Sequence, residues 1–199
     1  MSDDLFDLVV EPRAELAPLN GSDALRRVFS CFPTGVVALC ALVDGMPVGM
    51  IASSFAAVSL SPPLVSIYMR DASETWPKLR MAASVGITVL SEAQELQCRR
   101  LATRSGDRFT EVEWQASDEG AVFIEGGCAV LECTAFAEIP AGDHILALFE
   151  IQSAGSAPEV SPLVFHASRF ERLDRTRGRG IHPQGGLSIH FADGLTSQW

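Results

Sequence analysis

Hydroxyl groups in front of a short predicted helix are the first candidates for chemistry in this chain. Ser73 and Thr75 stand at the start of the helix predicted over residues 73–83, and a helix N-terminus with nearby hydroxyls binds anions readily. Lys78 is the only lysine, so a bound phosphate would be held by arginine, hydroxyl groups or backbone N–H groups. An ordinary helix cap has the same pattern, and the residues alone leave both interpretations open.

Three small residues, Ala52, Ser53 and Ser54, follow a predicted strand. Side chains of this size let a ligand approach the backbone closely, and the two hydroxyls can also reach it. The same triplet is typical of a tight strand end, and taken by itself it favours a strand end over a ligand-binding segment.

Arg108 and His144 are the charged and titratable candidates. Arg108 lies in a polar segment, where an arginine either pairs with an anion or is solvated. Asp143 immediately precedes His144 and would orient its imidazole ring, although a single histidine is more often structural. His166 ends a predicted strand and is interpreted as structural.

The five cysteines predict core packing rather than metal or redox chemistry. Their number is odd and they include no C-x-x-C pair. Cys40, Cys128 and Cys133 lie in apolar runs, where a free cysteine behaves as a small hydrophobic residue. No grouping of histidine, cysteine and carboxylate residues has the spacing of a zinc site, so no metal is predicted.

Length and charge exclude several classes of protein. The chain has 199 residues and a net charge of −10, which fits one domain and argues against nucleic-acid binding. No apolar run reaches the roughly 18 to 20 residues that span a bilayer. The N-terminus is acidic and lacks the pattern of a signal peptide, so we expect a cytoplasmic protein without membrane contact.

Short strands must position these candidates. We expect an arm (1–20), one domain (21–173) and a tail (174–199), with a polar loop over 104–120. No G-x-G-x-x-G fingerprint of a dinucleotide fold is present. The pattern predicts a mainly β domain with flanking helices, a closed or partly closed antiparallel barrel. The predicted strands are 35–43, 46–51, 55–60, 64–69, 85–90, 127–138, 143–153 and 161–166.

Two of the predicted helices carry specific signals. Leu25, Val28, Phe29 and Phe32 fall on one face of a helix over 21–32. The S-x-x-Q sequence that begins at Ser91 is a capping box, which predicts a helix running to about residue 103.

Seven short motifs, in order, resemble the flavin reductase-like family, whose fold is the FMN-binding split β-barrel. The resemblance extends from about Leu25 to Leu173, which is most of the chain. Any one motif is weak evidence, whereas seven in the same order are strong evidence. The motifs are Phe32-Pro-Thr-Gly-Val36, Gly49-Met-Ile-Ala-Ser-Ser-Phe55, Val58-Ser-Leu-Ser-Pro-Pro-Leu-Val65, Ser73-Glu-Thr-Trp76, Gly106-Asp-Arg-Phe109, Gly142-Asp-His144 and Pro162-Leu-Val-Phe-His166.

The resemblance implies a bound flavin, FMN or FAD, with NADH or NADPH as co-substrate. It implies that the flavin phosphate lies near Ser73 and Thr75, and that His144 positions the nicotinamide as the catalytic residue. A binding site for the flavin ring needs backbone N–H donors at the ring atoms where negative charge develops on reduction. The residues implied in flavin binding are Pro33, Thr34, Met50, Ile51, Ala52, Ser53, Ser54, Ser73, Thr75, Trp76, Thr88, Arg108 and Phe109.

The function implied is an NAD(P)H:flavin oxidoreductase that supplies reduced flavin to a partner monooxygenase. The family also implies a homodimer, which would bury the apolar strand faces of Leu64–Met69 and Val130–Phe136. Two alternatives remain: a flavin-binding protein that does not turn over NAD(P)H, and an enzyme that retains flavin and transforms an organic substrate. Ile51, Phe149 and the tail depart from the family pattern and favour these alternatives.

Overall fold

The computed structural model describes residues 14, 16–18, 20–104 and 106–173, and the backbone of 189–190 and 196–197. The predicted domain over 21–173 lies almost wholly within this part. The predicted arm and tail lie largely outside the described residues. Beyond residue 173, two short strands, β13 (Ile189–His190) and β14 (Thr196–Ser197), pair with each other.

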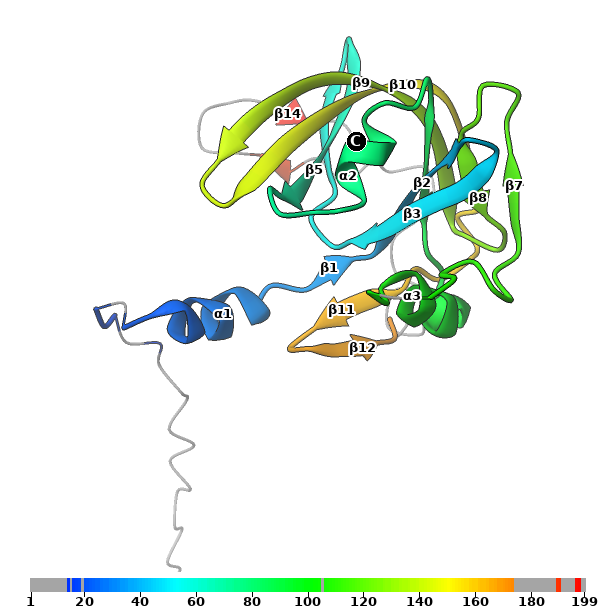
Figure 1. The fold of residues 1–199 in the computed structure, drawn as a ribbon. Coiled ribbons are helices and arrows are strands. Elements are labelled where there is room, and N and C mark those ends of the chain that lie inside the picture. Colours follow the sequence, from blue (N-terminus) through cyan, green and yellow to red (C-terminus); the bar gives the residue numbers. More distant parts are fainter. Residues whose placement is uncertain are drawn as a thin grey trace, which may run out of the picture.

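A seven-stranded antiparallel sheet with strand order β3-β2-β6-β9-β10-β5-β4 forms the body of the molecule (Figure 1). Its two ends approach each other, because the Ser54 hydroxyl, just beyond β3, donates to Tyr68 O and accepts from Tyr68 N–H on β5. The sheet therefore curls into the expected barrel. Its strands are β2 (Val37–Val43), β3 (Met46–Ala52), β4 (Ala56–Leu60), β5 (Pro63–Arg70), β6 (Val85–Val89), β9 (Ala129–Ala141) and β10 (His144–Ser156).

The continuous apolar run in β2 reflects burial on both faces of the strand. Leu39 faces the barrel interior with Ile67, Ile87 and Phe149. Cys40 faces outward into a second core, which lies under α3 (Glu95–Leu101) and the β7–β8 hairpin. A strand covered on both sides has no reason to alternate between apolar and polar residues.

The hairpin of β7 (Trp114–Ala116) and β8 (Val122–Ile124) corrects the expectation of a plain loop over 104–120. It lies against the outer face of the barrel, and the approach depends on Gly86 in β6. A Cβ atom at Gly86 would lie 2.2 Å from Val122 O. Only a residue without a side chain fits there, so β8 crosses β6 in near contact.

The helices are shorter than expected. α2 is a single turn (Trp76–Leu79) rather than a helix over 73–83. After Ser91, one 3₁₀ turn, η1 (Glu92–Gln94), leads into α3. The predicted capping box is present, since Gln94 Oε1 accepts the Ser91 backbone N–H at 2.8 Å.

A small three-stranded sheet forms beside the barrel from β1 (Thr34–Gly35), β11 (Val164–His166) and β12 (Arg169–Glu171). The continuous strand expected over 35–43 is therefore wrong at its start. The chain leaves the small sheet at Gly35, and only from Val37 onward does it pair with β3 and β6.

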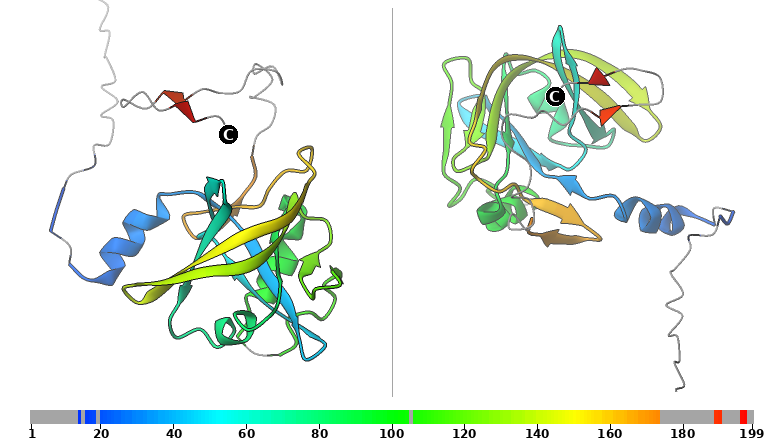
Figure 2. Two further views of the ribbon diagram at one scale, coloured as in Figure 1. Left: turned by 90° about the horizontal axis from the view of Figure 1, so that it is seen from above. Right: turned by 180° about the vertical axis from the view of Figure 1, so that it is seen from behind.

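Helix α1 (Ser22–Ser30) projects from the barrel in both views of Figure 2 and buries none of its residues. Its predicted apolar face is present but uncovered in the single chain. Val28 is 62% exposed and Phe29 is 67% exposed, and Phe32, just beyond the helix, is 74% exposed.

Two of the predicted core cysteines, Cys40 and Cys133, are fully buried. Burial raises the pKa of each thiol to about 12. Cys128 is only half-buried. None of the described helices combines the length and the apolar character needed to cross a bilayer.

Candidate functional site

Arg108 joins three separate segments at one side of the barrel. Its Nη1 atom donates to Gly49 O on β3 and to Thr75 Oγ1 before α2, each at 3.0 Å. The remaining N–H groups of the guanidinium have no acceptor among the described residues. A guanidinium offers five N–H donors, so Arg108 is fixed in place while donors remain for a ligand.

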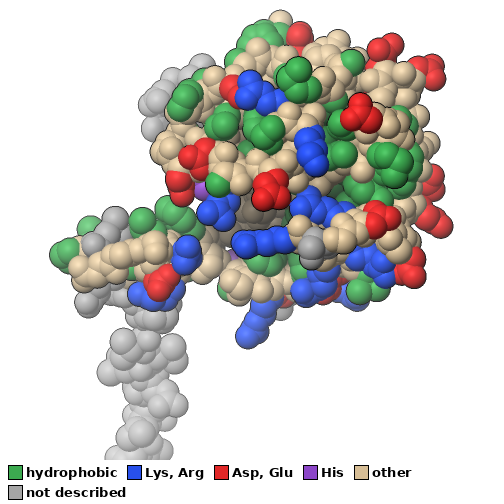
Figure 3. Space-filling view, in the orientation of Figure 1, with side chains coloured by type: hydrophobic (Ala, Val, Ile, Leu, Met, Phe, Trp, Pro, Cys, Tyr) green, Lys and Arg blue, Asp and Glu red, His purple; other side chains and the backbone are tan. Residues whose placement is uncertain are grey.

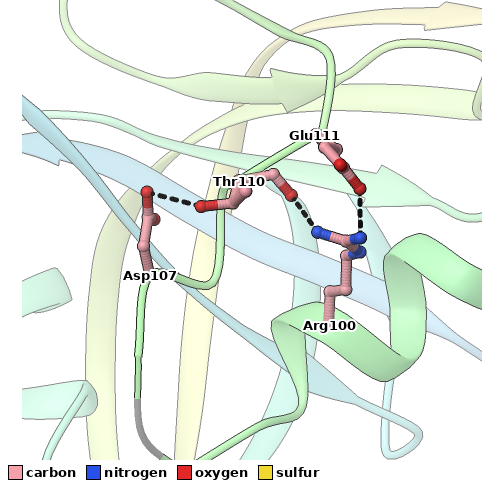
Figure 4. Close-up of polar contacts among 4 residues, drawn as sticks. All are labelled: Arg100, Asp107, Thr110 and Glu111. Carbon is pink, nitrogen blue, oxygen red and sulfur yellow. Dashed lines mark hydrogen bonds and ion pairs between the residues drawn. The ribbon is translucent and has the colours of Figure 1, made fainter.

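A compact turn fixes the loop that carries Arg108 (Figure 4). Asp107 accepts the Phe109 backbone N–H and the Thr110 hydroxyl, both at 2.9 Å. These two bonds, the first above all, lower the pKa of the Asp107 carboxyl below its usual value. Arg100 on α3 donates to Thr110 O at 2.7 Å and pairs with Glu111.

Gly49 begins one of the seven motifs but was not among the residues implied in flavin binding. A Cβ atom there would lie 2.4 Å from Cys40 Sγ and 3.0 Å from Phe109 Cζ. The Phe109 ring therefore covers the strand directly and also packs edge-on against Trp114, with ring centroids 6.5 Å apart. A glycine inside a predicted strand was the available signal for this close approach.

The two serines after β3 have different surroundings. Ser54 uses its hydroxyl to join the barrel edges at Tyr68. Ser53 is exposed and its hydroxyl has no partner among the described residues. The backbone from Ser53 to Phe55 lies between the β3 and β4 ladders and is paired in neither of them.

Of the remaining predicted flavin-binding residues, some lie beside Arg108 and others do not. Met50 and Ile51 are half-buried next to Gly49 on β3, and Ala52 is 8% exposed at the edge of the interior core. Pro33 and Thr34 lie on another part of the chain, where Thr34 pairs with Phe165 in the small sheet. Within the described part, no hydrogen bond joins these two residues to Arg108, whose partners are Gly49 and Thr75.

Ser73 lies two residues before Thr75, the N-cap of α2, and its Oγ accepts the Trp76 backbone N–H at 3.1 Å. The Trp76 side chain is 2% exposed and packs edge-on against Phe149, with ring centroids 5.8 Å apart. Trp76 is thus a core residue, and its ring is closed to a ligand. Phe149, one of the departures from the family pattern, is fully buried beside Trp76.

Thr88 also belongs to the core rather than to a ligand slot. It is fully buried, and its Oγ1 accepts the Ile124 backbone N–H at 3.0 Å. The hydroxyl is committed to holding the β7–β8 hairpin against β6. Matching a motif position does not reveal which side of a strand its side chain occupies.

His144 begins β10 and is paired across the ladder with Arg70 of β5. Its Nδ1 atom lies 2.7 Å from Asp143 Oδ1. This hydrogen bond lowers the pKa of the Asp143 carboxyl. Ser54 contacts Tyr68, two residues from Arg70 on β5, which corresponds to about 7 Å along a strand. His144 therefore lies toward the Ser53–Ser54 edge of the site.

Positive charge gathers at this side of a protein with a net charge of −10. Figure 3 shows mainly lysine and arginine side chains, with an acidic side chain among them, around the hollow between the barrel and the β11–β12 hairpin. Such a rim favours an anionic ligand. Within the part of the chain that the structure describes, no group of three or more histidine, cysteine or acidic residues is placed to hold a metal.

Comparisons with known proteins agree on one family. Residues 29–174 match the flavin reductase like domain. The chain is 32% identical over 170 residues to the flavin-dependent monooxygenase reductase subunit HsaB of Mycobacterium tuberculosis, covering 85% of this chain and 88% of that protein. It is 36% identical over 156 residues to the FMN reductase (NADH) SmoA of Agrobacterium fabrum, covering 78% and 88%.

A solved structure is similar as well. The NADH:FAD oxidoreductase SgcE6 of Streptomyces globisporus, in complex with NAD and FAD fragments, superposes with a TM-score of 0.76 and 37% identity. The alignment covers 81% of this chain and 98% of that one. The barrel expected from the sequence is thereby confirmed.

The turn around Asp107 generates a structural prediction. Asp107→Ala removes the acceptor of the Phe109 N–H, and we expect hydrogen exchange of that amide to accelerate by about threefold or more. Asp118→Ala, in the exposed β7–β8 turn, is the matched control and should leave the amide unchanged. Equal exchange rates in wild type and Asp107→Ala would show that the turn does not depend on this carboxylate.

Proposed function

Because the chain belongs to the flavin reductase-like family, we propose that it oxidises NADH, reduces FMN or FAD, and supplies the reduced flavin to a separate monooxygenase. The observation that carries the proposal is Arg108, which is anchored on Gly49 and Thr75 with donors to spare. Relatives named as NADH-dependent reductases support NADH as the nucleotide.

The residues present fit a flavin. A flavin nucleotide combines an anionic phosphate with a flat ring, so it needs cationic and hydroxyl donors next to exposed backbone. Arg108 and the Thr75 hydroxyl supply the cationic and hydroxyl donors. The segment Ser53–Phe55 supplies the exposed backbone. When bound, the flavin supplies the acceptor for the hydride of NADH.

Each side chain has a distinct task in this proposal. Arg108 and Thr75 hold the phosphate, and Ser53 supplies a free hydroxyl toward the ring or ribityl chain. His144 borders the nicotinamide, and Asp143 holds its Nδ1 atom. The Nε2 atom is then left to donate or accept a hydrogen bond. Hydride transfer needs no protein acid, so the role of His144 is positioning.

The test of the function is oxidation of NADH by the purified full-length chain with free FMN or FAD, followed at the nicotinamide absorbance. We expect turnover that depends on added flavin. No oxidation of NADH despite flavin binding would overturn the proposal and favour a flavin carrier. Flavin that remains bound through gel filtration, with no response to added flavin, would favour the enzyme with retained flavin.

His144→Ala tests the positioning role. We expect kcat/KM for NADH to fall about tenfold or more, which corresponds to ~1.4 kcal/mol of transition-state stabilisation, while flavin affinity changes little. His166→Ala on β11 is the matched control and should keep the kinetics of the wild type. A lower melting temperature with unchanged kinetics would assign His144 a purely structural role.

We propose further that the chain forms a homodimer, with α1 at the interface. Of the strand segments expected to pair, Leu64, Val65, Ile67 and Met69 are buried in the chain's own barrel, whereas Tyr68 of β5 and Phe136 of β9 are 45% and 52% exposed. The apolar face of α1 is exposed as well. Burying such a face is the common reason for a soluble protein to associate.

The dimer is tested by light scattering at micromolar concentration. We expect twice the mass of one chain for the wild type, and a monomer for the double variant Val28→Ser with Phe29→Ser, because the variant removes the apolar contact. Met81→Ser, which replaces another exposed apolar residue, is the control and should remain dimeric. A monomeric wild type would refute the proposal.

A cytoplasmic location completes the proposed function. All five cysteines are free thiols in the structure, and unpaired cysteines are typical of reducing compartments.

A further inference from the structure

A second hollow, of about 390 Å³, lies between the β7–β8 hairpin and strands β9 and β10. Gln115 and Ser117 come from the hairpin side, Phe123 and Val130 form an apolar wall, and Glu132 and Ser153 bring polar groups. The β7–β8 hairpin lies away from α2 (Figure 1), and none of the residues of the Arg108 site lines this hollow. Its volume suits a small organic molecule.

The Glu132 carboxylate is the one charged group lining the hollow. Ser117 donates to its Oε1 atom at 2.6 Å and Ser153 to its Oε2 atom at 3.1 Å. Ser84 Oγ lies 3.4 Å from Oε1 but nearer, at 3.2 Å, to Cys133 O. A hydroxyl has a single hydrogen, so Ser84 donates to Cys133 O. The Glu132 carboxylate then accepts hydrogen bonds from Ser117 and Ser153 only.

Glu132 therefore keeps unused acceptor capacity and an uncompensated charge. A carboxylate accepts about four hydrogen bonds, and two are in place. Among the described residues Glu132 forms no ion pair, whereas Glu138 on the same strand is paired with Arg80 at 3.4 Å. A half-buried carboxylate is stabilised when a cation reaches it.

The surroundings favour a cation over a nucleotide. Glu132 makes the lining of the hollow negative, and the turn that follows Ser117 adds Asp118 and Glu119 outside it, whereas the other site contains the Arg108 guanidinium. Ladder pairs connect Glu132 through Gly86 and Cys40 to Gly49, three strands away. Three strand spacings amount to about 14 Å, so the two sites are separate.

We propose that this hollow binds a small organic cation, a protonated amine attached to an apolar or aromatic body. The ammonium group donates to Glu132, and the body packs on Phe123 and Val130. Neither the flavin nor the nicotinamide nucleotide fits this description, because both are anions. The site goes beyond the proposed reductase function and does not depend on it.

The competing explanation is that Glu132 only fastens the hairpin to the sheet through Ser117 and Ser153. The two explanations differ in one observable. A fastening carboxylate has no affinity for a soluble amine, whereas a binding site distinguishes an amine from its neutral analogue of similar size.

The experiment uses the full-length chain with tyramine and with 4-ethylphenol, which has the same aromatic body without the ammonium group. We expect tyramine to shift the backbone amide NMR signals of Gln115–Ser117 and Ser153–Gly155 in a saturable manner. 4-Ethylphenol should bind about tenfold more weakly or worse. Equal binding of the two compounds, or no saturable shift at these residues, would overturn the proposal.

Glu132→Gln keeps the size of the side chain and removes the charge, and should weaken tyramine binding by about tenfold or more. Glu138→Gln, on the same strand but outside the hollow, should bind tyramine like the wild type. Unchanged tyramine affinity in a folded Glu132→Gln protein would overturn the proposal. If this variant does not fold, the comparison of the two compounds on the wild type decides alone.

Discussion

The crossing of β8 over β6 at Gly86 determines how the outer face of the barrel is built. Val122 O occupies the space of a Cβ atom, and Thr88 adds a hydrogen bond to Ile124 in the same crossing. The hairpin held there contains Trp114, whose ring supports Phe109, and Phe109 in turn covers Gly49. The position of Arg108 thus depends on two close approaches at glycines: the backbone of Val122 lies against Gly86, and the side chains of Cys40 and Phe109 lie against Gly49.

Much of the barrel was predictable because its signals are local. The run in β2, the capping box at Ser91 and the motifs of the family each depend on neighbouring residues in sequence. The β7–β8 hairpin was missed because each of its strands is only three residues long and it is held by contacts with β6, far along the chain. Helix α2 was overestimated because the apolar residues around it serve the barrel core rather than a helix face.

The candidate site was also predicted only in part from the sequence. Arg108 and Thr75 were named from the sequence, and the structure brings them within hydrogen-bonding distance of each other. Trp76 and Thr88 were named from matching positions, yet both are closed off in the core. A motif preserves the order of residues along the chain, whereas access to a ligand depends on which side of the sheet each residue faces.

The buried thiols have a consequence for the durability of the protein. A thiol must lose its proton to react quickly with peroxides or alkylating agents. Cys40 and Cys133, with pKa values raised to about 12, stay protonated at neutral pH and are shielded by the barrel wall. Cys31, which is exposed just after α1, is open to such reagents. Oxidative damage would therefore begin beside the exposed apolar face of α1 and leave the packing of the barrel intact.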